Sequence, residues 1–143
     1  MAPVILLAIA SVVGVLLLVL GTRLSVHRWV RWARDAAHYG ASDILNARQI
    51  NSELAVSELR AQFDAWNTIV KEGTVEFCRA GDAHRIQFFE APATLDFRAY
   101  NDEHRYIRQM TALRVDRLLD LASRVEAGET RLRAYFVPRA EQA

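Results

Sequence analysis

The residues best suited to bind a metal or take part in catalysis are one cysteine and three polar side chains in the second half of the chain. Cys78, Asp82 and His84 lie close together in the sequence, and folding could bring His104 near them. A structural zinc site is usually built from four Cys or His ligands in closely spaced pairs. The chain has no CxxC, HxxxH or HExxH pattern, so we predict no metal site and no cofactor. Cys78 is then interpreted as a small core residue.

The patterns that would indicate catalysis are also weak. Cys78 has two candidate bases in the sequence, but no third residue that would orient a base can be identified. The carboxylates of residues 102–120 alternate with arginines at spacings of three and four, which is typical of a solvated helix face with ion pairs. The chain contains no GxGxxG, GxxxxGK or GxSxG motif. We therefore expect that this protein is not an enzyme.

The N-terminal segment has the composition of a membrane-spanning helix. Residues 1–22 carry no charged side chain, and residues 4–20 are apolar except for Ser11 and Gly14. As a helix they would span about 26 to 30 Å, close to the hydrocarbon thickness of about 30 Å. A cleaved signal peptide would have a shorter apolar core preceded by positive charge, and a soluble core helix would need a polar face. We predict an uncleaved transmembrane anchor.

Basic residues follow this segment on one side only. Residues 23–34 hold four of the 18 basic residues and none of the 17 acidic residues. The positive-inside rule then places the N-terminus outside and the C-terminal part in the cytoplasm. We predict a single-pass bacterial protein of the inner (cytoplasmic) membrane.

The segment 23–41 interleaves arginine with tryptophan, which is typical of a membrane interface because rings lie at headgroup level and guanidinium groups reach phosphates. Recognition of anionic lipid or nucleic acid is the alternative, and nucleic acid is disfavoured because the rest of the chain is acidic. A break near residues 39–42 would allow Ser42 or Asp43 to cap the next helix. The residues expected at the interface are Arg23, Arg28, Trp29, Arg31, Trp32 and Arg34.

Residues 42–137 carry two amphipathic helical patterns, and residues 138–143 form a polar tail. In residues 43–72 apolar side chains recur at steps of three and four. A second pattern runs from Thr94, as a helix cap, to about Val125, and Gly128 ends it. The stripe of the first pattern consists of Val56, Leu59, Phe63, Trp66 and Val70.

Two interpretations are open for residues 74–90. Apolar and polar residues alternate on both sides of a Gly81–Asp82 turn, which favours a short β-hairpin. Helical continuation to about Arg79, followed by a loop and a short helix, is the alternative. In both cases we predict a mainly α fold, in which the anchor and a basic juxtamembrane helix precede an antiparallel pair of long amphipathic helices.

A single helix pair would leave apolar surface exposed, which predicts packing against a protein partner or another copy. The protein is therefore expected to be a membrane-anchored scaffold or accessory subunit that contacts lipids and a protein partner. The alternative is a self-assembling membrane effector or sensor with a cytoplasmic ligand-binding part. Aromatic residues dominate buried contact energy, although each candidate could equally belong to the core, which is favoured for the first two. The partner-contact candidates are Phe63, Trp66, Phe88, Phe89, Tyr100, Tyr135 and Phe136.

Overall fold

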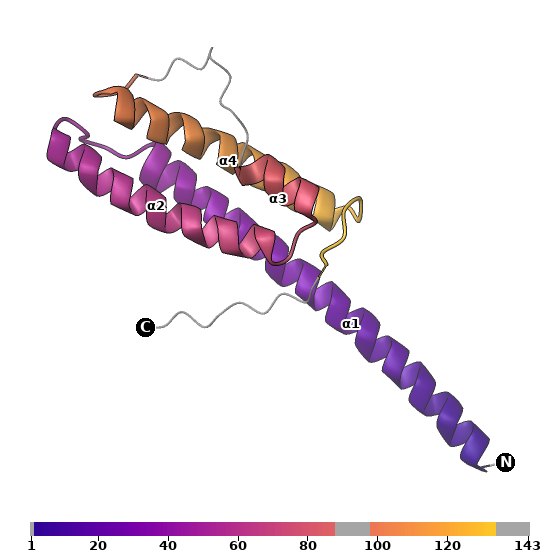
Figure 1. Ribbon diagram of the computed structural model, residues 1–143. Helices are drawn as coiled ribbons and strands as arrows, with labels where there is room; N and C mark the ends of the chain where they lie inside the picture. Colours follow the sequence, from indigo (N-terminus) through magenta and orange to yellow (C-terminus); the bar gives the residue numbers. More distant parts are fainter. Residues whose placement is uncertain (1, 88–97, 134–143) are drawn as a thin grey trace.

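The computed structural model describes residues 2–87 and 98–133, and its regular elements in these ranges are all helical (Figure 1). Helix α1 spans Ala2–Tyr39 and passes directly into a π-helical segment, η1, at Gly40–Leu45. Helix α2 spans Glu53–Val75, α3 spans Ala80–Gln87 and α4 spans Asp102–Glu126. The prediction of a mainly α fold is confirmed.

The N-terminal half of α1 projects alone from the rest of the protein (Figure 1). Its large apolar side chains between Val4 and Leu20 are 44% to 72% exposed. Within residues 2–87 and 98–133, α1 with η1 is the one helix that is long and apolar enough to cross a membrane. The coarse form of the transmembrane prediction therefore holds: α1 can span a bilayer.

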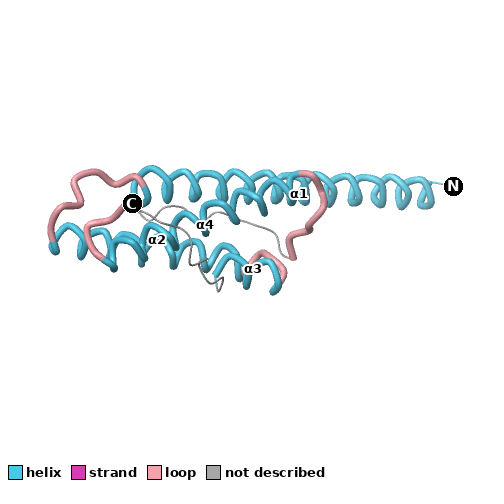
Figure 2. The backbone as a smooth tube through the Cα atoms, turned by 90° about the horizontal axis from the view of Figure 1, so that it is seen from above, coloured by secondary structure: helices cyan, strands magenta, loops and turns pink. Residues whose placement is uncertain are grey.

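The C-terminal half of the same helix belongs to a bundle with α2 and α4 (Figure 2). It runs antiparallel to α2, because Trp29 contacts Gly73 while Ala36 contacts Trp66. It also runs antiparallel to α4, since Arg34 pairs with Glu126 near one end and Arg108 reaches Leu45 near the other.

The two long amphipathic helices are parallel to each other, so the predicted antiparallel pair is wrong. Arg60 of α2 reaches Glu103 and Tyr106 of α4, and Phe63 lies one turn further along beside Arg114. A short loop would force neighbouring helices to be antiparallel. Here α2 ends near the apolar half of α1 and α4 begins at the opposite end of the bundle, so α1 supplies the antiparallel neighbour of both helices.

The predicted β-hairpin is also wrong for the described part of residues 74–90. No strand occurs there up to Gln87, and Ala80–Gln87 form α3. Phe77 and Cys78 are adjacent and both buried, whereas a strand would turn them to opposite faces. The short helix of the alternative interpretation is what the structure contains.

The helix starts differ from those predicted. Ser42 donates a hydrogen bond to the carbonyl oxygen of His38 at 2.8 Å, and the chain continues as η1 without a break at residues 39–42.

Helix α2 instead begins after Ser52, whose hydroxyl accepts from the Ala55 N–H at 3.2 Å. Asn101 caps α4 in the same way, and the predicted cap Thr94 lies outside the described residues. Gly128, with φ +77°, ends this helix as predicted.

The core lies between the three long helices. The predicted stripe of α2 is buried, with every member no more than 3% exposed. Ile107, Leu118, Leu121 and Val125 of α4 are buried in the same hydrophobic cluster as Leu59, Phe63, Trp66 and Val70. Because α1 adds a third wall, the core is thicker than that of a helical hairpin.

Candidate membrane-proximal surface and partner groove

The bundle begins within a few residues of the C-terminal end of the apolar half of α1. Leu20 is the last residue of the apolar run and Ser25 is the first buried residue of the bundle. Five residues of helix rise by about 8 Å, and each headgroup layer is about 5 to 8 Å thick. If α1 spans a membrane, the adjacent end of the bundle therefore lies at or just below the headgroups.

Trp29 is part of the protein core, not an interface anchor, which corrects the prediction. Its side chain is fully buried and its indole Nε1 donates to the Gly73 carbonyl oxygen at 3.2 Å. Helical periodicity places Trp29, Ala33 and Ala37 on one face of α1, and that face packs on the bundle. Trp32 is half-buried beside it and packs on Gly73.

The predicted interface arginines are divided between two environments. Arg23, Arg28 and Arg31 are exposed on α1 and remain available to an external partner. Arg34 is also exposed but forms an ion pair with Glu126 of α4. Arg34 therefore contributes to the packing of α1 against α4, and this contact gives no support to the predicted role of Arg34 as a lipid anchor.

A groove of about 580 Å³ lies between α1 and α2 on the outside of the bundle. Its apolar lining includes Trp32 and Ala36 of α1 and Ala65 and Ile69 of α2, of which Ile69 is 53% exposed. The remaining lining residues are Arg28, Arg31, Asp35, Tyr39, Gln62 and Trp66. The guanidinium groups of Arg28 and Arg31 thus lie at the end of the groove that is nearest to the apolar half of α1.

Most of the predicted partner-contact residues do not lie on this surface. Trp66 lines the groove but is only 3% exposed, and its Nε1 donates to the Ala36 carbonyl oxygen at 2.8 Å. Phe63 is buried in the core, whereas Tyr100 is exposed away from the groove. Phe88, Phe89, Tyr135 and Phe136 lie outside the described residues. Sequence reasoning missed Ile69 because it lies off the buried stripe of α2.

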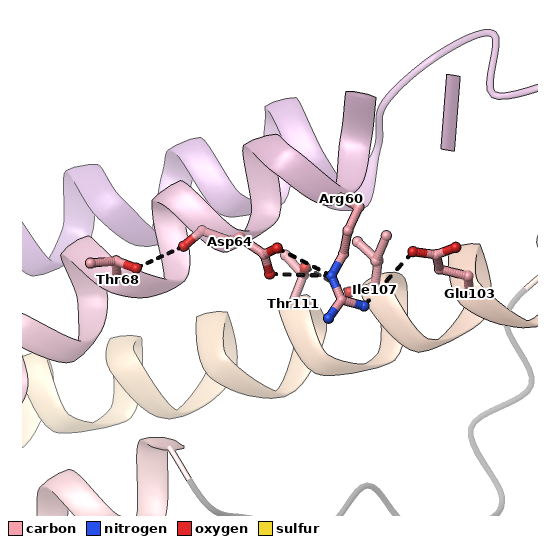
Figure 3. A network of polar contacts seen from close by, with 6 residues as sticks. All are labelled: Arg60, Asp64, Thr68, Glu103, Ile107 and Thr111. Atoms are coloured by element: carbon pink, nitrogen blue, oxygen red, sulfur yellow. Dashed lines mark hydrogen bonds and ion pairs between the residues drawn. The ribbon is translucent and has the colours of Figure 1, made fainter. Parts of the chain in front are cut away.

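Some arginines form the ion pairs that their spacing predicts. Arg60 contacts Asp64 one turn later at 3.2 Å and also reaches Glu103 of α4 at 3.9 Å (Figure 3). Arg105 pairs with Asp102 at 2.7 Å. These groups are substantially solvent-exposed, so each pair contributes little to stability.

Other arginines donate to backbone carbonyls at the ends of neighbouring helices, a role that sequence spacing did not reveal. Arg108 reaches the Leu45 carbonyl oxygen at 3.2 Å, and Arg117 reaches that of Arg85 at 3.1 Å. Arg133 donates to the carbonyl oxygens of Val75 and Glu76 at 2.7 and 2.9 Å. Since terminal carbonyls lack partners within their own helix, these contacts stabilise η1, α3 and α2 from outside.

The thiol of Cys78 is not arranged as a nucleophile. Cys78 is 1% exposed, and burial, with a smaller effect of Asp82, raises its pKa to about 12. A nucleophilic cysteine needs the opposite shift. Asp82 forms an ion pair with Arg124 at 3.7 Å. Within residues 2–87 and 98–133, no three His, Cys, Asp or Glu side chains are grouped so that they could hold a metal ion.

A second cleft, of about 530 Å³, lies between α3 and α4. Its charged lining consists of three aspartates and three arginines, which are Asp82, Arg85, Asp116, Arg117, Asp120 and Arg124. Charges of opposite sign alternate there, so the cleft favours neither an anion nor a cation.

Comparison of the chain with protein-family models, with curated proteins and with solved structures finds no match.

Proposed function

We propose that this chain is a single-pass, membrane-anchored interaction protein that serves as a scaffold or accessory subunit of a membrane complex. The observation that carries the proposal is the continuity of α1, whose first half is apolar and exposed while its second half is buried in the bundle. A helix without interruption couples a membrane segment rigidly to a soluble domain. The arginines that follow the apolar half favour a cytoplasmic bundle at the inner membrane.

The partner proposed for the α1–α2 groove is a helix that emerges from the same membrane. The groove follows α1 from Arg28 to Tyr39, so a neighbouring transmembrane helix that continues below the bilayer enters it without a turn. Apolar residues of that helix would cover Ile69 and Ala36. Acidic residues near its membrane end would face the guanidinium groups of Arg28 and Arg31.

Orientation is tested with an engineered cysteine. Cys78 is buried, so Ser57→Cys on the exposed face of α2 is the better site for a membrane-impermeant thiol reagent. We expect no labelling in sealed cells and full labelling after the cells are opened. Labelling in sealed cells would contradict a cytoplasmic bundle.

Partner binding is tested by measuring the mass and composition of the particle extracted from its native membrane in mild detergent. Foreign subunits at a fixed ratio are expected, and Ile69→Arg should release them. The matched control is Leu54→Arg, because Leu54 is an exposed aliphatic residue of the same helix that does not line the groove. Equal recovery of the partner with both variants would refute the groove as the docking site.

Self-assembly is the second candidate, and one observation favours it. Arg31 and Asp35 both line the groove on α1, so a second copy in the same membrane orientation could pair its Asp35 with Arg31 of the first. A particle mass at a multiple of 16.2 kDa with no foreign chain would support this candidate. Loss of that multiple in Arg31→Asp, with recovery in Arg31→Asp/Asp35→Arg, would establish the pairing.

A further inference from the structure

We infer that the membrane-facing end of the bundle is a binding surface for anionic lipid headgroups, in which Arg79 and Arg131 act together with Arg23 and Arg28. The inference rests on the proposed membrane anchoring of α1, but it does not depend on the protein partner. The segments that carry Arg79 and Arg131 are remote from the apolar run in the sequence, and only folding brings them to the end of the bundle next to that run.

Contacts of α2 place Arg79 at this end. The hydrogen bond between Trp29 and Gly73 sets the last turns of α2 beside the first buried turns of α1. The chain beyond Gly73 therefore extends toward the apolar half of α1. Arg79 lies in the turn between α2 and α3, is exposed, and has no ion-pair partner among the described residues.

Arg131 is placed by a segment that crosses from the end of α4 to the end of α2. Thr130 is held by Arg124, whose Nη2 donates to its hydroxyl at 3.0 Å. Arg133 is held by three contacts, two from its guanidinium group and one from its N–H to the Phe77 carbonyl oxygen at 2.9 Å. Arg131 lies between these fixed points and is exposed. Figure 1 shows the segment at the end of the bundle from which α1 emerges.

Charge is distributed unequally between the two ends of the described bundle. The membrane-facing segments 22–28, 76–80 and 127–133 contain five arginines and two glutamates. The opposite segments 46–53 and 98–103 contain two arginines and three acidic residues. The positive end is the one that α1 would hold within about 8 Å of the apolar segment. Arginine also forms paired hydrogen bonds with phosphate oxygens.

The test uses the full chain inserted in nanodiscs that contain equal amounts of phosphatidylcholine and phosphatidylglycerol. Native mass spectrometry after release measures the ratio of the two lipids that each chain retains. We expect the wild type to retain phosphatidylglycerol preferentially and to lose this preference in high salt. Arg79→Gln/Arg131→Gln should reduce the preference by on the order of fivefold for each arginine. Arg79→Lys/Arg131→Lys should reduce the preference less than the glutamine pair does, because lysine keeps the charge but not the paired hydrogen bonds.

The matched control is Arg48→Gln/Arg98→Gln, which removes two exposed arginines from the opposite end. Emission of the buried Trp29 and Trp66 reports whether each variant remains folded. An unchanged lipid ratio in folded Arg79→Gln/Arg131→Gln, or an equal loss in the control, would overturn the inference while leaving anchoring intact. Failure of the wild type to insert into nanodiscs would instead refute the anchoring, and the inference with it.

Discussion

Trp29 donates a hydrogen bond from its indole nitrogen to the carbonyl oxygen of Gly73 at 3.2 Å, and both residues are buried. The bond joins the first bundle turn of α1 to the last turns of α2. It also satisfies a terminal carbonyl of α2, while Arg133 satisfies those of Val75 and Glu76. The end of α2 is therefore held by side chains from two other segments, Trp29 of α1 and Arg133 of the segment that follows α4.

Replacement of Gly73 by alanine should destabilise this junction. A Cβ atom at this position would lie 2.1 Å from Cη2 of Trp32, and the ring is part of a packed interface. Overpacking typically costs about 1 to 3 kcal/mol, which exceeds the gain of about 1 kcal/mol in helix propensity. Urea unfolding followed by tryptophan fluorescence measures the net effect. Gly81→Ala is the control, because its Cβ would meet nothing within 4 Å, and we expect no loss of stability there.

Trp66→Ala should lower the free energy of unfolding by about 3 to 5 kcal/mol. The ring is 3% exposed and fills the space between α1 and α2. Trp66→Phe keeps most of the volume but loses the bond to Ala36, so its cost should be smaller. Ile69→Ala, on the exposed side of the same helix, should be close to neutral. An unaltered stability of Trp66→Ala would contradict the core position of this residue.

Arg114→Met should be neutral or stabilising. Arg114 is 7% exposed and packs over the Phe63 ring at 5.3 Å, and among the described residues its Nε and Nη1 have no hydrogen-bond partner. Burial lowers the pKa of this guanidinium group. Its Nη2 donates to the Gln87 carbonyl oxygen at 3.4 Å. Replacement of buried ion pairs by apolar residues of similar volume is often neutral or stabilising by about 1 to 4 kcal/mol, and the cost of burying the Arg114 charge is removed in the same way by methionine. Thermal unfolding measures the change, and a large loss in the methionine variant would show that the charge has a partner. Arg114→Ala should be destabilising because it leaves a cavity.

Stability should decrease when the pH falls from about 7 toward 5. Burial, and secondarily the charge of Arg108, lowers the pKa of His104 below 6.5. Its Nδ1 accepts a hydrogen bond from the Tyr100 N–H at 2.9 Å, which requires the unprotonated nitrogen. The unfolded chain then binds a proton at higher pH than the folded chain, so the free energy of unfolding falls below pH 6.5 and levels off below the folded-state pKa. Denaturant titrations at several pH values measure this slope, and His104→Gln should reduce it.

Cys78 should be unreactive in the folded protein. The thiol is 1% exposed, and burial raises its pKa to about 12, so very little thiolate is present at pH 8. We expect iodoacetamide to modify it only as fast as the bundle opens, and readily in urea. Rapid modification of the native protein would show that the α2–α3 connection is more open than the structure describes.

The α2 pattern was predictable because its buried residues contact several neighbours through one continuous stripe. The steps of three and four from Val56 to Val70 are sufficient to identify that face. Trp29 was misplaced for the opposite reason. Its sequence neighbours are arginines, which suggest an interface, and only the packing of the bundle against the face of α1 that carries Trp29 shows that the ring is buried.

The sequence by itself determined the apolar segment, the helical class and the face that α2 buries, because each depends on composition or on a period within one segment. Only the tertiary structure decided that α1 is a wall of the bundle, that α2 and α4 are parallel, and that Arg79 and Arg131 lie at the end of the bundle from which the apolar half of α1 emerges. These features depend on the direction in which connections return the chain and on contacts such as that between Trp29 and Gly73. No local periodicity encodes them, since the residues involved are far apart in the sequence and each is compatible with several partners.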